Sequence, residues 1–226
     1  VRVVAPADGL TITEGGPLHF VAEVQDANED VATVRLFVDS LAVADANVSL
    51  TTQDRYTMTW DTTLAGSHTI AIEALDNLGN SIAVEHGTIE VGPKVSYENV
   101  PGVLFKNPNP DLNSTILTTT SEIYLVAQAN DLDGTVKDLQ FYENENAIGD
   151  PVDFDENSST GSGIFTALKK WSPEKVGLYT FYAVATDPEG NVGMSQPLTI
   201  TVVPGSINPT LRFINPPLPE EEGAST

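Results

Sequence analysis

The chain contains an internal repeat, and this repetition limits its fold more than any other feature. Residues 25–39 (QDANEDVATVRLFVD) are echoed by residues 130–144 (NDLDGTVKDLQFYEN), and residues 68–80 (HTIAIEALDNLGN) by residues 179–191 (YTFYAVATDPEGN). The copies lie about 105 residues apart in the first match and about 111 apart in the second. Because this spacing is the size of one small domain, we expect two similar domains in succession.

A third copy begins near the end of the chain. Residues 211–216 (LRFINP) resemble residues 103–108 (VLFKNP). We therefore expect a first domain at 1–92, a second at 93–204, and a linker with the start of a third repeat at 205–226. The sequence indicates a part of a longer array, in which function belongs first to the succession of domains.

Apolar and polar residues alternate along short segments in both copies. Leu18, Phe20 and Ala22 share one face of a segment, as do Phe181 and Ala183 in the second copy. This pattern is typical of half-buried antiparallel strands, and about seven of them per domain predict an all-β immunoglobulin-like sandwich. We expect strands at 17–25, 31–39, 54–60, 67–75 and 81–91, and at 122–130, 136–143, 164–171, 178–186 and 192–203.

The change in repeat spacing places an insertion of about six residues between Asn144 and Trp171. It covers the acidic and Ser/Gly-rich residues 150–163, for which we expect an acidic hairpin. Trp171 echoes Trp60, and their matching positions favour packing in the core or at a sheet edge.

Together these motifs resemble the bacterial immunoglobulin-like (Big-type) domains that occur in tandem in large surface and secreted proteins. In copy one the resemblance rests on residues 5–9 (APADG), 34–39 (VRLFVD), 56–61 (YTMTWD), 66–69 (GSHT) and 74–80 (ALDNLGN). In copy two it rests on residues 139–142 (LQFY), Trp171, 177–179 (GLY) and 185–191 (ATDPEGN). Copy two departs from the pattern at residues 107–111 (NPNPD). The resemblance implies a role in adhesins, cell-wall proteins or S-layer proteins, or as a spacer in polysaccharide-degrading enzymes.

Charge and cysteine content exclude several classes of function. A formal net charge of −22 repels nucleic acid and anionic headgroups, so neither is an expected partner. No run approaches the roughly 18 apolar residues of a membrane span, so we expect no membrane insertion in this segment. The chain has no cysteine, which excludes disulfides, thiolate metal sites and a cysteine nucleophile.

The sequence does not predict a catalytic site. The only histidines, His19, His68 and His86, all lie in copy one and are interpreted as residues on strand surfaces. Asp153, Asp155 and Glu156 could be imagined as a glycosidase pair, but a Gly/Ser loop is a poor place to hold a fixed carboxylate separation. We therefore expect no enzyme activity.

Turn carboxylates give a candidate calcium site in each domain. The turn between the first two expected strands of a domain and the turn before its last expected strand lie at the same end of such a sandwich, where their oxygens could surround a hard cation. Ordinary turn chemistry also uses Asp, Asn and Gly, so both interpretations stay open. The candidate ligands are Asp131, Asp133, Asp187 and Glu189 in copy two, and Asp26, Asn28, Asp30 and Asp76 in copy one.

Three Asn-x-Ser/Thr sequons, at Asn47, Asn113 and Asn157, are candidate glycosylation sites in expected turns or edges.

Two functional hypotheses follow. The first is a structural or adhesive repeat of an extracellular surface protein, such as a fibre, stalk, adhesin or S-layer. Its partners would be neighbouring repeats, like chains or surface glycans, and calcium would stiffen its domain junctions. The alternative is a carbohydrate-binding or spacer module of a secreted polysaccharide-degrading enzyme. That alternative requires exposed aromatic rings, for which the candidates are Trp60 with Tyr56, or Tyr142 with Tyr182.

Overall fold

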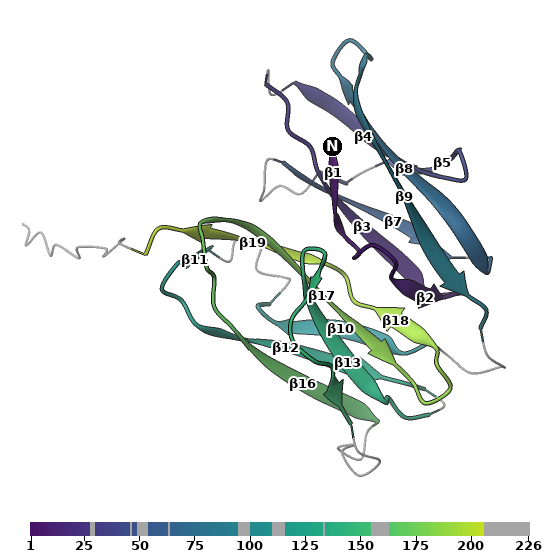
Figure 1. The fold of residues 1–226 in the computed structure, drawn as a ribbon, viewed down its shortest axis with the longest axis vertical. Helices are drawn as coiled ribbons and strands as arrows, with labels where there is room; N and C mark the ends of the chain where they lie inside the picture. The colour runs from purple at the N-terminus through teal and green to yellow at the C-terminus, as the bar shows by residue number, and fades with distance from the viewer. Residues whose placement is uncertain are drawn as a thin grey trace, which may run out of the picture.

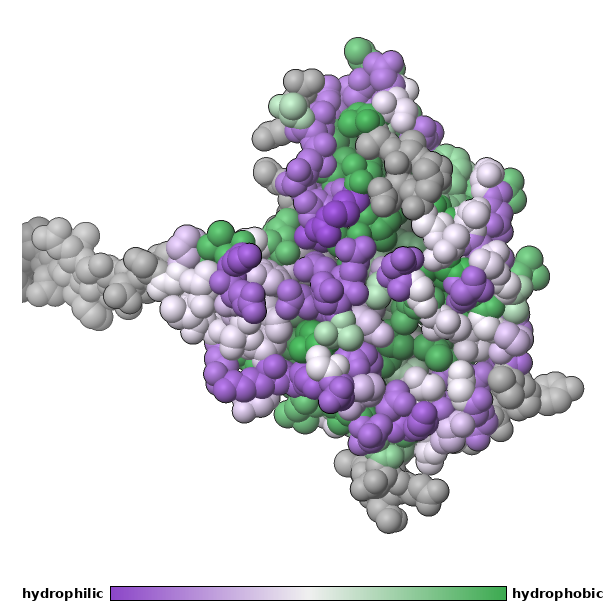
Figure 2. Space-filling model, in the orientation of Figure 1, coloured by the Kyte–Doolittle hydropathy of each residue, from purple (hydrophilic) through white to green (hydrophobic). Residues whose placement is uncertain are grey.

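The chain folds into two β-sandwiches that pack against each other (Figure 1). The computed structural model describes residues 1–27, 30–45, 47–48, 54–62, 64–94, 100–109, 116–132, 134–154 and 163–205. Within these ranges the chain forms strands and turns without a helix, so no helix there could cross a membrane. Hydrophilic residues spread over the visible face of both domains (Figure 2).

The first domain contains a four-stranded sheet, called here the β3 sheet, in the order β1-β3-β7-β6, and a five-stranded β8 sheet in the order β2-β9-β8-β4-β5. Its strands are β1 (Arg2–Ala5), β2 (Thr11–Thr13), β3 (Pro17–Glu23), β4 (Val31–Val38), β5 (Leu41–Asp45), β6 (Asn47–Val48), β7 (Arg55–Asp61), β8 (Gly66–Asp76) and β9 (Ser81–Gly92).

The second domain contains a three-stranded β12 sheet in the order β10-β12-β16 and a larger β17 sheet, β11-β19-β17-β13-β14, to which β15 and β18 add. Its strands are β10 (Gly102–Asn107), β11 (Ile116–Thr118), β12 (Ile123–Asn130), β13 (Asp138–Glu143), β14 (Asn146–Ala147), β15 (Val152–Asp153), β16 (Ile164–Trp171), β17 (Gly177–Thr186), β18 (Val192–Met194) and β19 (Leu198–Val203).

The start of each domain changes sheets, as in immunoglobulin folds. β1 pairs antiparallel with β3, and the chain then crosses so that β2 runs parallel to β9. In the second domain β10 pairs with β12, and β11 runs parallel to β19. The same topology in both halves confirms the predicted tandem of all-β immunoglobulin-like sandwiches.

The expected strands agree with the structure except in the last strand of the second domain. There β18 and β19 are separate, because the chain leaves the ladder at Ser195 to Pro197. The beginning of the acidic insertion pairs with β13 through β15, where Asp153 lies opposite Asp138. The tip of the expected hairpin falls outside the described residues.

Each sandwich closes over a core with a tryptophan at the same position. Trp60 lies opposite Leu18 on the inner face of the β3 sheet, and Trp171 lies opposite Ile123 in the β12 sheet. The two indoles are only 8% and 6% exposed, which agrees with a packing role.

In each domain, the first side chain of one turn holds that turn to a neighbouring strand by a hydrogen bond, and we call this arrangement the lock. Asp39 follows β4 with a φ of 51°, and its Oδ1 accepts a hydrogen bond from the Thr69 backbone at 2.9 Å. Asn144 follows β13 with a φ of 52°, and its Oδ1 accepts one from the Thr180 backbone at 3.2 Å. Asp and Asn tolerate this left-handed conformation better than most residues.

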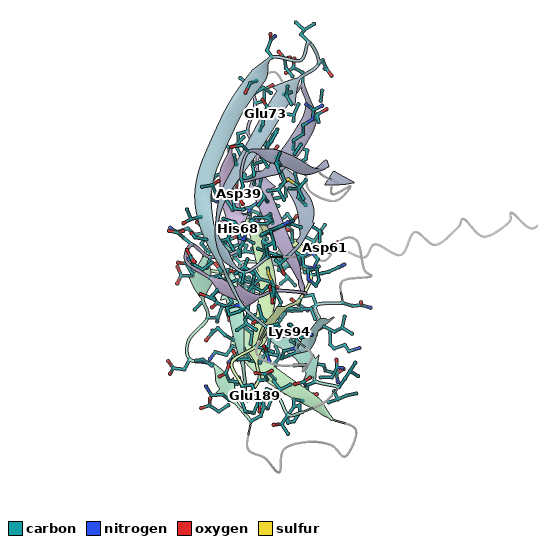
Figure 3. The ribbon with its side chains drawn as sticks, turned by 90° about the vertical axis from the view of Figure 1, so that its right-hand side faces the viewer. Asp39, Asp61, His68, Glu73, Lys94 and Glu189 are labelled. Atoms are coloured by element: carbon teal, nitrogen blue, oxygen red, sulfur yellow. The ribbon has the colours of Figure 1, made fainter. Side chains whose placement is uncertain are left out.

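The first domain adds an ion pair to this lock. His68 Nδ1 lies 2.7 Å from Asp39 Oδ2, and His68 Nε2 lies 3.0 Å from the Leu64 carbonyl oxygen. Asp39 and His68 are adjacent in Figure 3. Because both ring nitrogens face acceptors, the imidazolium fits this site better than the neutral ring. The hydrogen bond to Asp39 raises the pKa of His68, and the same bond lowers the pKa of Asp39.

The lock predicts a pH dependence of stability. The raised pKa of His68 gives stability that is complete below its ordinary pKa of 6.5 and is lost as the pH rises through the folded value. The lowered pKa of Asp39 gives stability that is complete above 3.8 and is lost as the pH falls. The pair therefore stabilises the first domain most between pH 3.8 and 6.5.

Asp39→Asn copies Asn144 and keeps the backbone acceptor while removing the charge. Denaturant unfolding at about pH 5.5 and about pH 8.5 should show a smaller loss of stability with rising pH in this variant than in the parent chain. Equal losses in the two proteins would contradict the lock.

Candidate functional site at the domain junction

The junction begins with a strand that is buried on both faces. Leu18 and Phe20 of β3 point into the core of the first domain, opposite Trp60 and Met58. His19 and Val21 occupy the opposite face of the same strand, yet they are only 5% and 0% exposed. The outer face of the β3 sheet is buried along β3, because the second domain covers this part of it.

The second domain contributes a strand of the same kind. Phe181 and Ala183 of β17 belong to the core of their own domain. Tyr182 and Val184 project from the other face and, with Met194 of β18, join the apolar cluster of the first domain. The two sandwiches therefore share a continuous apolar layer, and β17 and β18 lie beside β1, β2 and β3 (Figure 1).

Tyr182 is the centre of the junction. Its hydroxyl oxygen accepts a hydrogen bond from the Ala7 backbone N–H at 2.7 Å, and its side chain is fully buried. Burial raises the pKa of Tyr182 far above its ordinary value. The Tyr142 ring stacks on it, with centroids 4.7 Å apart and planes within 3°. A second bond joins the domains where the Val192 backbone N–H donates to Thr13 Oγ1 at 2.8 Å.

A charged network closes one margin of the junction. Arg2 pairs with Glu23 at 3.2 Å and, across the junction, with Glu145 at 3.5 Å. Arg55 pairs with Glu23 at 2.9 Å and donates to the Leu178 carbonyl oxygen of β17 at 3.4 Å. Arg55 is 3% exposed, and burial lowers its pKa. These bonds connect β1, β3 and β7 of the first domain to the second.

The linker closes the other margin. A Cβ atom at Gly193 would collide with the carbonyl oxygen of Pro101, so glycine permits the linker to lie directly on β18. A cavity of about 630 Å³ remains between the domains, and its lining includes His19, Lys94 and Asn130. His19 Nδ1 lies 3.0 Å from Thr59 Oγ1, and burial lowers the pKa of His19.

The histidines differ from the prediction that they lie on strand surfaces. His19 is buried by the second domain, and His68 is buried beside Trp60, with ring centroids 5.0 Å apart. The side chain of His86 lies outside the described residues. Of the imagined glycosidase pair, Asp153 lies in β15 opposite Asp138 of β13, while Asp155 and Glu156 lie outside the described residues.

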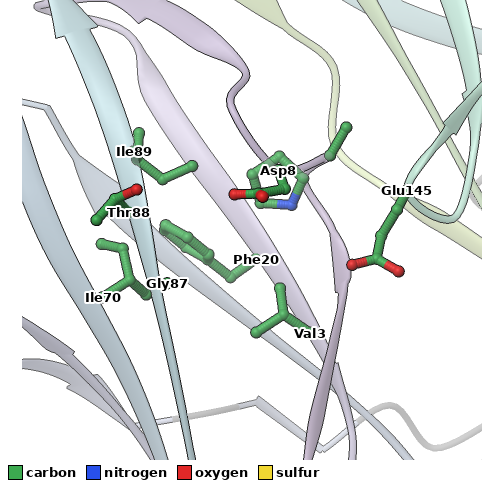
Figure 4. A pocket seen from close by; sticks show the side chains of 10 residues that line it. Val3, Asp8, Phe20, Ile70, Gly87, Thr88, Ile89 and Glu145 are labelled. Atoms are coloured by element: carbon green, nitrogen blue, oxygen red, sulfur yellow. The ribbon is translucent and has the colours of Figure 1, made fainter.

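A smaller pocket of about 380 Å³ opens at the edge of the first sandwich (Figure 4). Phe20, Ile70 and Ile89 give it apolar walls, while Asp8 and, from the second domain, Glu145 add carboxylates. The pocket is therefore an apolar recess with an acidic margin.

Three of the predicted cation ligands gather at the outer end of the first domain. The Asp30 backbone N–H donates to Asp26 Oδ2 at 3.2 Å. A hydrogen bond with the Asp26 side chain raises the pKa of Asp30, and the charge of Asp76 adds to this effect. Asp76 already accepts bonds from the backbone N–H groups of Leu78 and Asn80, at 2.9 and 2.8 Å. Asn28 lies outside the described residues.

In the second domain the predicted ligands include a buried turn. Asp187 is 1% exposed and accepts two bonds of 2.7 Å from Asn191, one from its backbone and one from its side chain. Asp131 is 8% exposed, Glu189 lies on the turn surface, and Asp133 is outside the described part of the chain. No group of three or more His, Asp or Glu side chains in the described ranges has an arrangement that could hold a metal ion. The calcium sites stay predictions.

The remaining candidates from the sequence are the three sequons and the four aromatic residues. Of the sequons, Asn47 lies in β6, while Asn113 and Asn157 fall outside the described ranges. Of the four aromatic residues that the carbohydrate hypothesis names, Tyr56, Trp60 and Tyr182 are buried, at 7%, 8% and 0% exposed, while Tyr142 is partly exposed and stacks on Tyr182. The three buried rings are therefore not available as a sugar-binding platform.

Comparisons with known proteins give a family match for the first domain and similar solved structures for the whole chain. Residues 1–72 match the model of the bacterial Ig domain family. No curated protein matches the chain. Similar solved structures include fibronectin(III)-like modules of Clostridium thermocellum CbhA, at 16% identity and a TM-score of 0.36, covering 90% of this chain and 93% of that one. The N-terminal Ig1-2 module of the Drosophila receptor protein tyrosine phosphatase DLAR is similar at 10% identity and a TM-score of 0.37, covering 89% and 98%.

Solved structures with such low identity and TM-scores carry no information on what this chain binds or does. The family match covers most of the first sandwich, and the second sandwich repeats its strand topology and its core tryptophan. Residues 1–72 therefore match the bacterial Ig domain family, and the chain as a whole is a tandem of two immunoglobulin-like β-sandwiches.

Proposed function

We propose that this chain is a structural segment of an extracellular surface protein and that its two sandwiches act as one rigid, docked unit. The observation that carries this proposal is the junction, where Val21 of one domain and Tyr182 of the next are both 0% exposed. A domain that served only as a bead on a string would keep its outer sheet face polar and wet.

The free energy of docking supports a unit that stays closed. A fully buried apolar side chain contributes about 1.5–3 kcal/mol relative to an exposed one, and several such side chains meet here. The linker between Gly92 and Gly102 is short, so the domains meet at a high effective concentration. The bond from Ala7 to Tyr182 and the pair between Arg2 and Glu145 fix the orientation.

An extracellular location is supported by family and composition. Residues 1–72 match the bacterial Ig domain family, and a net charge of −22 favours solubility and repels nucleic acid. Its expected partners are neighbouring repeats of the same chain, with like chains or surface glycans at the outer surface. The carbohydrate-binding alternative loses support because three of its four candidate rings are buried.

Calcium at the outer turns is a further part of this proposal. Asp26, Asp30 and Asp76 are close enough that the pKa of Asp30 is raised, and a divalent cation would relieve the repulsion between them. The bonds that Asp76 accepts from its own turn compete with this role.

The docked unit is tested by placing a charge in the junction. Val21→Asp should separate the domains and raise the radius of gyration measured by small-angle X-ray scattering, because an unpaired carboxylate is costly to bury. Val126→Asp is the matched control, since Val126 holds the equivalent place on the second domain and is not covered by another domain. It should leave the radius unchanged. An unchanged radius in Val21→Asp, with folded domains by circular dichroism, would refute the docked unit.

The hydrogen bond at the centre of the junction can be removed separately. Tyr182→Phe leaves the Ala7 N–H without its acceptor and should lower the free energy of unfolding by about 1–3 kcal/mol in denaturant titrations. Tyr142→Phe, whose ring lies in the same stack, is the control and should cost much less. Equal losses in the two variants would argue against a special role for Tyr182.

The calcium proposal predicts a higher melting temperature in calcium than in EDTA. Asp30→Asn should remove most of that difference, because it removes one of the crowded carboxylates. If calcium leaves the melting temperature of the parent chain unchanged, the outer turns are ordinary hydrogen-bonded turns.

A further inference from the structure

The outer face of the β12 sheet carries apolar side chains in contact with solvent. Paired residues of an antiparallel ladder share a face. Leu168 lies opposite Val126, and Tyr124 lies two residues before Val126 on β12, so it is on the same face. Leu104 of β10 belongs to the same face through its pairing with Gln128. Leu104, Tyr124 and Leu168 are 51%, 54% and 56% exposed. We call these residues, with Val126, the β12 patch.

The β12 patch is equivalent to the face that is docked in the first domain. Both sheets share one register: Val3 lies opposite Ala22 as Phe105 lies opposite Ala127, and Leu18 lies opposite Trp60 as Ile123 lies opposite Trp171. The equivalent positions are therefore Arg2 and Leu104, His19 and Tyr124, Val21 and Val126, and Thr57 and Leu168.

The two faces differ in whether another domain covers them. In the first domain His19 and Val21 are 5% and 0% exposed, because the β17 sheet of the following domain covers them. In the second domain the same positions are more apolar, since tyrosine and leucine replace histidine and threonine, and yet the face is open. Exposed apolar clusters of this kind mark interaction surfaces.

The sequence after the second domain indicates what would cover the patch. Residues 211–216 (LRFINP) repeat residues 103–108 (VLFKNP), and Asn215-Pro216 matches Asn107-Pro108 at the same spacing. The next segment of the chain thus begins as the second domain begins. In the first junction, the domain that begins in this way docks on the outer face of the domain before it.

We propose that the β12 patch is the docking surface for the next immunoglobulin-like repeat of the same chain, which covers it with the sheet equivalent to the β17 sheet. This inference rests on the proposed function, because it extends the first junction to the second. The charge of Lys106, exposed on β10 beside the patch, favours such a partner, because the chain as a whole has 32 acidic and only 10 basic residues. Lys170 on β16 is already paired with Glu122 at 2.7 Å.

The absence of cysteine from the sequence permits a direct test by thiol labelling. Leu168→Cys is introduced into the 226-residue chain and into the same protein extended through the following repeat. Its reaction with a small thiol reagent should be at least about tenfold slower in the extended protein, since labelling then requires the docked face to open. Thr166→Cys, on the same face, is a second probe that leaves Leu168 in place.

Two controls separate this inference from the proposed function. Leu78→Cys, at a position that is 86% exposed, should react rapidly in both proteins, and Val21→Cys should be protected in both. If Leu168→Cys and Thr166→Cys react equally fast in both lengths while Val21→Cys is protected, the first junction stands and the inference is wrong. Protection in the 226-residue chain that rises with concentration would show that a second copy covers the patch, which also overturns it. A reactive Val21→Cys would instead refute the docked unit itself.

Discussion

The structure depends on one apolar layer that belongs to both domains. The outer face of a sheet at the surface of a sandwich is normally polar, and this allows a tandem to bend at its linker. Here Val21 and Tyr182 lie in that layer fully buried, and the charged network around Arg55 seals its margin. Close contact between two sheet faces also accounts for the glycine at 193, against which the linker packs. It accounts as well for the two tyrosines stacked in the junction.

The fold was largely predictable because the core has a strict period of two. The alternation predicted strands at 17–25 and 178–186, which agree with β3 and β17 to within two residues, and the repeat predicted two successive domains. The same segments also contain apolar residues on the face that alternation assigns to solvent. Val21 interrupts the polar face of β3, and Tyr182 and Val184 make β17 a nearly continuous apolar run, which is the pattern of a strand buried on both faces. The sequence does not say which surface supplies the second cover, because that depends on the orientation of a whole neighbouring domain.

The candidate site was predictable only in part, for a different reason. Asp76 and Asp187 were placed correctly in the turns after β8 and β17, but a carboxylate in a turn serves a backbone N–H as readily as a cation. His19 sits at a position that alternation assigns to the surface, and it is buried because the next domain covers it, a contact that local sequence does not show. His68 shares a face with Ile70 and Ile72, so alternation places it inward, where it packs beside Trp60 and bonds to Asp39.

The lateral packing of the two sandwiches has a mechanical consequence. Domains joined side by side span less distance than the same domains placed end to end. A pulling force applied to the ends of such a chain would therefore meet the sheet-to-sheet contact before it meets the strands of either core. Separation of the contact would release length while both sandwiches stay folded, and the short linker would draw the faces together again when the load falls. The junction would then act as a reversible contact that lengthens the chain under load while both domains stay folded.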